Sequence, residues 1–345
     1  MVTVTYHTGR YIRDEEIMAN NVIPTFSTGL NPIWASFNQR SRVPKGALMV
    51  LSDAEWSSDY VADDPIPDRL TMSEFGYRPE ELNYRDGVLD DTALVTPVRL
   101  LNPEGAQILS SICKGLENYA LGSDFIISRR FRGADMVSTF IYNMMRDRRF
   151  LIRLSRIAGV PLLPHPLRDG STQINYYQAE SGDAEEVGKW HHDGMEYVFT
   201  MLMTDPAEYE GGQFGYFVGR RDEFDRKTLS NDRIRIAPLK SVGDTVFARG
   251  SQIYHGVSPV TVGSRMVLTL SMFSPAFADC DPNSFAHVAA DDGIPHTLPN
   301  WMRLKWPTKN PFRDYALRSS SPVINWSDLR PQPASAATLI EEPAE

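Results

Sequence analysis

The chain has 345 residues and a formal net charge of −9, with 42% apolar and 23% charged residues. This composition is that of an ordinary globular protein with a sizeable core, arranged as one large domain with extensions or as two modest domains. The acidic balance argues against nucleic acid as a partner, because binding to a phosphate backbone is driven by basic surface.

Targeting segments and cysteine content indicate which cellular compartment to expect for the protein. The sequence contains no apolar run of the length expected for a signal peptide or a membrane span. Cys113 and Cys280 are too few for a disulfide framework or a zinc site, and both are expected to be buried as small hydrophobic residues. A cytoplasmic protein without a membrane partner is therefore expected, and its oligomeric state is left open.

The first half of the chain predicts a helix-rich region. Apolar residues recur at roughly helical spacing over 106–116 and over 140–157, and Gly159-Val160-Pro161 is expected to end the second helix. Proline and acidic clusters within 52–90 predict loops. The basic stretch 129–132 is expected to lie on a solvated helix or loop edge.

From about residue 170 the pattern becomes that of short strands. These strands are rich in β-branched and aromatic residues, and turn signals such as Glu210-Gly211-Gly212, Gly243-Asp244 and Gly263-Ser264 separate them. Short, regularly punctuated strands are typical of a sandwich or barrel rather than of βαβ units. The expected strands are 172–178, 197–204, 212–218, 233–238, 245–248, 253–260 and 266–273.

One motif in the strand-rich region places metal-ligand residues at strand spacing. In Lys189-Trp190-His191-His192-Asp193, His191 and Asp193 are two residues apart, so on a strand they share one face while His192 points away. His255 is the candidate for a third ligand from a neighbouring strand. Two imidazoles and one carboxylate leave three metal positions open, which is the facial triad of Fe(II) oxygenases.

A cation follows the third candidate ligand. Arg265 comes after Gly263-Ser264, and a turn there would place it on the next strand, facing the same cavity as His255. A guanidinium can hold a carboxylate through two parallel hydrogen bonds. The sequence therefore predicts a carboxylate-binding residue beside the metal site.

Taken together, these motifs resemble the prolyl-hydroxylase-like branch of the Fe(II)/2-oxoglutarate-dependent dioxygenase superfamily, including fungal biosynthetic members with a similar Trp-His-His-Asp motif. The resemblance covers 170–275 and also includes Glu210-Gly211-Gly212-Gln213-Phe214, Gly243-Asp244-Thr245-Val246-Phe247 and His255-Gly256-Val257. It implies iron held by His191, Asp193 and His255. It also implies that Arg265 binds the C5 carboxylate of the co-substrate 2-oxoglutarate.

Two further co-substrate residues are suggested by the resemblance. Tyr177 is similar to the family tyrosine on the strand before the metal motif. The family's second tyrosine is missing, and Thr200 lies where it would be and could serve as the hydroxyl donor. The sequence also departs from many relatives at Val267, which replaces a serine two residues after the arginine.

The expected fold is α+β and mainly β, with a double-stranded β-helix, or jelly-roll, core. Residues 1–169 are expected to form a helix-rich region packed on the core, and 170–275 the core itself. Residues 276–330 are expected to form a C-terminal extension, and the Ala-, Pro- and Glu-rich 331–345 a disordered tail.

The resemblance implies an enzyme that uses Fe(II), 2-oxoglutarate and O₂ to oxidise a C–H bond and releases succinate and CO₂. Three classes of function are open. The first is a biosynthetic oxygenase acting on a small molecule such as an amino acid or secondary metabolite, by hydroxylation, oxidative cyclisation or desaturation. The second is a protein or peptidyl hydroxylase with a groove-like site. The third, a non-catalytic jelly-roll binding protein, is disfavoured because the triad and Arg265 would serve no binding purpose.

Overall fold

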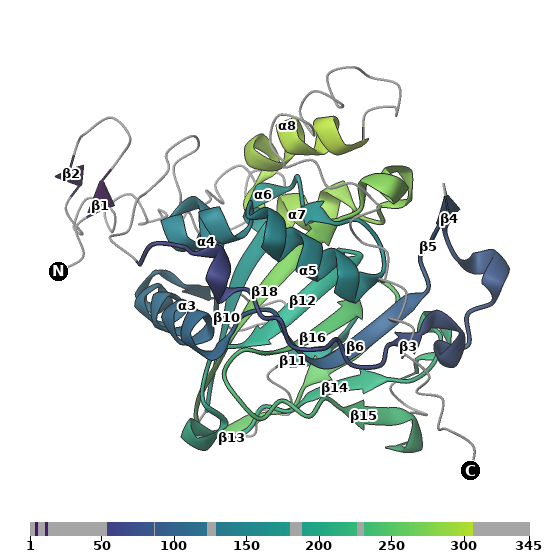
Figure 1. Ribbon diagram of the computed structural model, residues 1–345, viewed down its shortest axis with the longest axis horizontal. Helices are drawn as coiled ribbons and strands as arrows, with labels where there is room; N and C mark the ends of the chain where they lie inside the picture. Colours follow the sequence, from purple (N-terminus) through teal and green to yellow (C-terminus); the bar gives the residue numbers. More distant parts are fainter. Residues whose placement is uncertain are drawn as a thin grey trace, which may run out of the picture.

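Two facing antiparallel sheets form the centre of the molecule (Figure 1). The computed structural model describes residues 4–5, 11–12, 54–85, 87–122, 129–179, 188–225 and 231–305. The larger sheet has ten strands and the smaller has four. Two separate two-stranded pairs are β1 (Val4–Thr5) with β2 (Tyr11–Ile12), and β4 (Tyr84–Arg85) with β5 (Val88–Leu89).

The strand order is consistent with a jelly roll, because from β10 onward the chain crosses repeatedly between the two sheets. The larger sheet contains, in order, β3 (Leu70–Thr71), β6 (Thr92–Arg99), β16 (Asp244–Arg249), β12 (Tyr197–Leu202), β18 (Val260–Phe273), β10 (Thr172–Gln178), β8 (Arg129–Arg132) and β7 (Leu121–Gly122), with β9 (Leu163–Pro164) and β13 (Tyr209–Gly211) also paired to β18. The smaller sheet contains, in order, β11 (Gly188–His191), β17 (His255–Val257), β14 (Phe214–Phe217) and β15 (Ile234–Ile236).

Six α-helices accompany the sheets within the described residues. They are α3 (Pro103–Gly115), α4 (Thr139–Met144), α5 (Arg148–Ala158), α6 (Arg168–Ser171), α7 (Phe285–Asp292) and α8 (Ile294–Lys305). Short 3-10 turns are η1 (Ser58–Tyr60), η2 (Met72–Phe75), η3 (Pro79–Glu81), η4 (Glu117–Tyr119), η5 (Ala134–Met136), η6 (Pro206–Glu208), η7 (Arg221–Glu223), η8 (Asn231–Arg233) and η9 (Pro275–Cys280). Helices α3, α4 and α5 cover one face of the larger sheet (Figure 1).

Helix-capping residues explain where these helices begin and end. The Asn102 side chain accepts a hydrogen bond from the backbone of Gly105 and starts α3. The single helix expected over 140–157 is two helices, because Asp147 caps a new first turn by accepting from the Phe150 N–H. Gly159 ends α5 in the left-handed conformation with φ of 79°, as expected.

Apolar side chains form separate clusters on the two faces of the larger sheet. The outer cluster joins helices and strands through Leu109, Phe140, Phe199 and Phe247, among others. The inner cluster lies between the sheets and includes Tyr177, Leu202, Phe214, Val246, Val257 and Val267. The space between the sheets is therefore lined by alternate residues of β10, β12, β16 and β18.

The expectation of a helical N-terminal half is not supported. Besides α3 to α5, described residues of 54–169 contribute β3, β6, β7, β8 and β9 to the larger sheet. Strand β6 was missed because Thr92 to Val95 are all buried, so the sequence shows no polar–apolar alternation there. The basic stretch 129–132 is strand β8 rather than a solvated edge, with Phe131 buried and Arg132 paired with Asp292.

Each strand expected after residue 170 has a counterpart, most with different ends, but β11 and β13 were not expected, and Gly211 and Gly263 lie in strands where turns were expected. The expected 172–178 is β10 in full, and β18 runs from Val260 to Phe273 without the expected turn at Gly263-Ser264. Gly263 has φ of 72° and pairs with Tyr209, and a Cβ there would collide with the carbonyl oxygen of Glu208. Glycine therefore bends this strand without ending it.

Three further expectations concerned the cysteines, membrane-spanning segments and the C-terminal residues. Cys113 is buried as expected, whereas Cys280 is exposed, so the expectation for Cys280 is wrong. None of the helices in the described residues is long and apolar enough to cross a membrane. The expected extension 276–330 is described as far as Lys305, and the expected tail 331–345 lies outside the described residues.

A buried acidic residue attaches the C-terminal helices to the core. The Asp281 carboxylate lies 3.0 Å from Nε2 of His165 and accepts a hydrogen bond of 2.8 Å from Nζ of Lys305, at the end of α8. Burial alone would raise the pKa of Asp281. Hydrogen bonds from His165, Lys305 and Asn283 outweigh this effect and hold the pKa well below its usual range.

We expect Asp281→Asn to lower the melting temperature most clearly at neutral pH. Because the folded pKa of Asp281 is depressed, its contribution to stability is present above the unfolded pKa and is lost as pH falls through the folded value. The difference in melting temperature between wild type and variant should therefore shrink in strong acid. Thermal unfolding at several pH values tests this, and a difference that stays constant with pH would contradict it.

Candidate metal centre

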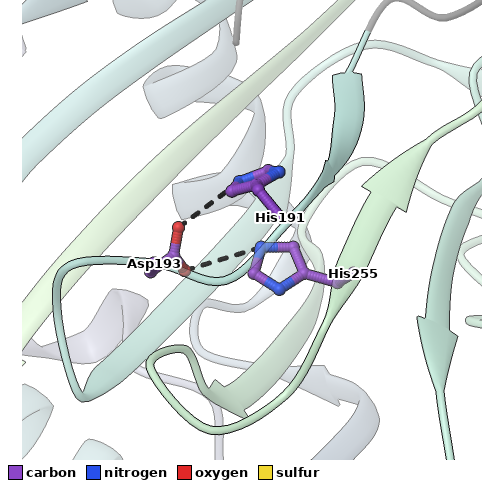
Figure 2. A group of neighbouring side chains, drawn as sticks. All are labelled: His191, Asp193 and His255. Carbon is purple, nitrogen blue, oxygen red and sulfur yellow. Dashed lines mark ion pairs between the residues drawn. The ribbon is translucent and has the colours of Figure 1, made fainter. Parts of the chain in front are cut away.

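Two histidines lie opposite each other on neighbouring strands of the smaller sheet. His191 ends β11 and is the register partner of His255 on β17, and their ring centroids are 4.5 Å apart. Asp193 follows in the loop after β11 and points between the two rings (Figure 2). Its carboxylate oxygens lie 3.5 Å from Nε2 of His191 and 3.5 Å from Nε2 of His255.

The two rings are held with their Nε2 atoms facing the carboxylate. Nδ1 of His191 lies 2.6 Å from the carbonyl oxygen of Lys189, and Nδ1 of His255 lies 3.0 Å from that of Ile253. A carbonyl oxygen can only accept, so in each neutral ring Nδ1 carries the proton and donates. Nε2 is then left with a lone pair, which is the orientation that metal-binding histidines require.

Asp193 reaches the cluster from a loop rather than from a strand. Strand β11 ends at His191, so strand alternation does not place Asp193 as the sequence argument assumed. Its backbone N–H donates instead to the carbonyl oxygen of Gly250, at 2.8 Å. A Cβ on Gly250 would lie only 2.6 Å from Oδ2 of Asp193, so glycine is needed for the carboxylate to take this position.

His192 lies outside this cluster. Its ring packs edge-on against Tyr254, with centroids 5.4 Å apart, and it is not among the residues whose ligand atoms gather. The gathered ligand atoms of His191, Asp193 and His255 all lie within 4.8 Å of one another.

Burial and charge act in opposite directions on the three groups. Burial would raise the pKa of Asp193, but the neighbouring His255 and His191 outweigh it and lower the pKa. Burial lowers the pKa of His255, although the Asp193 charge opposes this. For His191, burial would lower the pKa, but the hydrogen bond and charge of Asp193 raise it. The carboxylate is therefore ionised at neutral pH, as a metal ligand must be.

This donor set fits a divalent iron. Two imidazole nitrogens and one carboxylate oxygen on one side of an ion form the facial triad of non-haem Fe(II) sites. The two backbone carbonyls that fix the histidine rings supply the outer hydrogen bonds typical of metal sites.

Arg265 is a buried cation with no acceptor among the described residues. It lies on β18 with 1% of its surface exposed, and none of its three guanidinium nitrogens has a hydrogen-bond partner among the described residues. Its guanidinium carbon lies 5.3 Å from the ring centre of Tyr177, its register partner on β10. A buried charge without a partner is costly, so this arrangement points to a bound carboxylate.

Tyr177 lies beside Arg265 and belongs to the cluster between the sheets. Burial raises the pKa of its phenol, while the charge of Arg265 lowers it and that of Asp193 raises it. Both charges therefore act on the same hydroxyl group. At neutral pH this phenol keeps its proton and can donate a hydrogen bond.

Thr200 and Val267 also lie on the inner face of the larger sheet. Thr200 is partly exposed and pairs with Val246 and Thr269 on the neighbouring strands. Thr269 is four residues, or roughly 13 Å, along β18 from Arg265, so the backbone of Thr200 is far from the Arg265 backbone. Val267, at the family's serine position, is buried in the inner apolar cluster.

The sequence analysis missed three residues in or beside the loop 192–196, which carries Asp193 and is called the metal loop below. Gly250 supports Asp193, and Glu196 and Arg249 form a buried ion pair next to it. No motif marks them. Gly250 follows a predicted strand, and this position was the only sequence signal that could have drawn attention to it.

Comparison with known proteins gives structural likenesses only. No protein-family model and no curated protein matches the chain. The structure of SnoN, a non-haem α-ketoglutarate-dependent epimerase from nogalamycin biosynthesis, is 15% identical and covers 53% of this chain and 78% of its own, with a TM-score of 0.42. SnoK, a carbocyclase from the same biosynthesis, is 15% identical over 53% of this chain and 79% of its own, with a TM-score of 0.37.

A third neighbour is HygX from Streptomyces hygroscopicus, solved with nickel and 2-oxoglutarate bound. It is 18% identical over 54% of this chain and 83% of its own, with a TM-score of 0.38. SnoN and SnoK are thus described as non-haem, α-ketoglutarate-dependent proteins, and HygX as a protein that binds nickel and 2-oxoglutarate.

Proposed function

We propose that the protein is a non-haem Fe(II)- and 2-oxoglutarate-dependent oxygenase that oxidises a C–H bond of a small molecule. The observation that supports this most directly is the pairing of two features on facing sheets. One is the cluster of His191, Asp193 and His255. The other is the buried guanidinium of Arg265, which has no acceptor among the described residues.

In this proposal each residue has a distinct part. His191, Asp193 and His255 hold the iron through Nε2, a carboxylate oxygen and Nε2. Bound iron would supply the oxidising chemistry, using O₂ and 2-oxoglutarate and releasing succinate and CO₂. Arg265 binds the distal carboxylate of 2-oxoglutarate with its two-pronged guanidinium, Tyr177 donates a hydrogen bond beside it, and Thr200 contributes a hydroxyl from the inner face.

A dicarboxylate suits this pair of sites. His191, Asp193 and His255 would leave positions of a bound divalent metal free for the 2-oxo acid group of a ligand, and a second carboxylate on the same ligand would supply the acceptor that Arg265 lacks among the described residues. Tyr177 and Phe214 belong to the same cluster between the sheets, and the Phe214 ring stacks on that of His255 with centroids 5.4 Å apart, which supports a ligand that lies between the metal cluster and Arg265.

The substrate is proposed to be a small molecule such as an amino acid or secondary metabolite, changed by hydroxylation, oxidative cyclisation or desaturation. Helices α7 and α8 support this choice over a protein hydroxylase. They supply Val288 and Leu304 to an apolar cluster that includes Met195 and Val198, next to the metal loop. Helices packed beside this loop favour an enclosed small ligand over an extended peptide in an open groove.

The proposal is tested by two measurements on the purified protein. The Ni(II)-loaded protein should bind 2-oxoglutarate in calorimetry, and addition of Fe(II), ascorbate and 2-oxoglutarate should release succinate. A panel of free amino acids and peptides should then show which class accelerates succinate release. Failure of the metal-loaded protein both to bind 2-oxoglutarate and to form succinate would overturn the proposal, and stimulation by peptides alone would favour a peptidyl hydroxylase.

A further inference from the structure

A buried charge network lies directly behind the metal loop. Its charged members are Asp90, Glu196 and Arg249, with 0%, 7% and 4% of their surface exposed. Arg249 donates from Nε to a carboxylate oxygen of Glu196, and its Nη1 lies 2.8 Å from Oδ1 of Asp90. Two carboxylates therefore share one guanidinium in the interior.

Two hydroxyl groups complete the network. The Tyr197 hydroxyl donates to Oδ2 of Asp90 at 2.7 Å, and the Ser251 hydroxyl donates to Oε2 of Glu196. Each oxygen of Glu196 therefore has a partner, one from β16 and one from the turn that follows it. Charge-assisted hydrogen bonds of this kind are stronger than neutral ones and more demanding in geometry.

The network joins the two chain segments that carry metal-ligand candidates. Glu196 lies three residues after Asp193 in the loop, and Ser251 lies in the turn that leads to His255. The backbones of the two segments are also joined, since the Asp193 N–H donates to the carbonyl of Gly250 and the Gly250 N–H donates to that of Glu196, both at 2.8 Å.

Regular structure does not hold the loop at this point. Strand β11 ends at His191 and β12 begins at Tyr197, so residues 192–196 belong to no ladder. Two backbone hydrogen bonds join this loop to Gly250. The Glu196 side chain adds hydrogen bonds to Arg249 and Ser251. His192 also packs against Tyr254, and Met195 lies in an apolar cluster, so Glu196 supplies the charged attachment of this loop.

Stability alone is a poor reason for such a network. Removing charges from water is costly, and well-packed apolar residues often replace a buried ion pair without loss of stability. Apolar contacts have no preferred direction, so they would not hold the loop 192–196 at a fixed distance from the turn that contains Ser251. Metal ligands held by outer hydrogen bonds typically lose 10- to 100-fold in metal affinity when those bonds are removed.

We propose that Glu196 and Arg249, together with Ser251, are positioning residues that hold the Asp193 carboxylate at metal-binding distance from His255. They act through the loop backbone and through Gly250, without touching the metal themselves. This inference rests on the proposed function only in that the three gathered side chains bind a divalent metal.

The test compares two carboxylate-to-amide variants of buried residues. Glu196→Gln keeps the shape of the side chain and removes its charge. Asp135→Asn is the matched control, because Asp135 is also buried, accepts from the Thr172 hydroxyl at 2.7 Å and lies 3.8 Å from Arg146. Asp135 makes none of the described contacts to the metal loop.

Each purified variant is titrated with Co(II) well below its melting temperature, and the visible absorption spectrum of the bound Co(II) is recorded. We expect Glu196→Gln to bind Co(II) about tenfold or more weakly and with an altered spectrum. Asp135→Asn should lose stability but keep the wild-type Co(II) affinity and spectrum. Ser251→Ala, which removes a single hydroxyl, should weaken Co(II) binding in the same direction by a smaller factor and serves if Glu196→Gln fails to fold.

The outcomes separate this inference from the proposed function. Wild-type Co(II) affinity and spectrum in both Glu196→Gln and Ser251→Ala would reduce the network to a structural role and overturn the inference. A wild-type protein that binds Co(II) but neither binds 2-oxoglutarate nor forms succinate would overturn the proposed function and leave the inference standing. A wild-type protein that binds no Co(II) would overturn both.

Discussion

Asp193→Ala is expected to abolish metal-dependent turnover, while His192→Ala keeps iron binding. Asp193 supplies the single carboxylate of the cluster and lies 3.5 Å from a nitrogen of each histidine, so its removal leaves two neutral rings for a divalent ion. The loss of metal affinity should exceed the 10- to 100-fold typical of losing an outer hydrogen bond. Iron content after desalting and succinate release measure the two effects.

His192→Ala is the matched control for that experiment, because His192 is the direct neighbour of both residues yet packs against Tyr254. Its iron content should equal that of the wild type. The opposite pattern, in which His192→Ala loses iron and His191→Ala keeps it, would mean that the ligand assignment is shifted by one residue.

Arg265→Leu is expected to weaken 2-oxoglutarate binding by about 100-fold or more without changing iron content. Two hydrogen bonds to a charged carboxylate are lost, each worth roughly 1.5–3 kcal/mol, and about 1.4 kcal/mol corresponds to tenfold in affinity. Arg265 is not one of the three side chains whose ligand atoms gather, and it lies on the larger sheet beside Tyr177. Calorimetry with 2-oxoglutarate and a separate iron assay check both parts.

Stability gives a second measurement of the same change. In the co-substrate-free protein the Arg265 guanidinium is buried without an acceptor among the described residues, which costs free energy. We therefore expect Arg265→Leu to melt at the same or a higher temperature than the wild type without 2-oxoglutarate. The rise in melting temperature that 2-oxoglutarate causes in the wild type should disappear.

Arg265→Lys serves as a control that keeps the charge but not the two-pronged geometry, and it should fall between wild type and Arg265→Leu. Unchanged 2-oxoglutarate affinity in Arg265→Leu would remove Arg265 from the site. Turnover by the wild type without any 2-oxo acid would contradict the proposed co-substrate.

Much of the strand pattern after residue 170 could be predicted because it is local. Alternation and glycine-rich turns predicted 172–178 as a strand, and β10 has those bounds. The motif spacing also predicted that His191, Asp193 and His255 would lie together, and the structure places them together, while their role as ligands stays a prediction. The reason assumed for Asp193 was wrong, because a loop held by Gly250 places it there.

The sequence by itself determined which side chains were available for metal and carboxylate binding and where most of the later strands run, because residue type and spacing act over a few neighbouring residues. Only the tertiary structure decided that β6 and β8 join the larger sheet, and that Gly263 bends a strand instead of ending it. It also brought Asp90, Glu196 and Arg249 into one network. These features depend on contacts between segments far apart in the chain, and the free energy of such contacts comes from burial and pairing that no local pattern records.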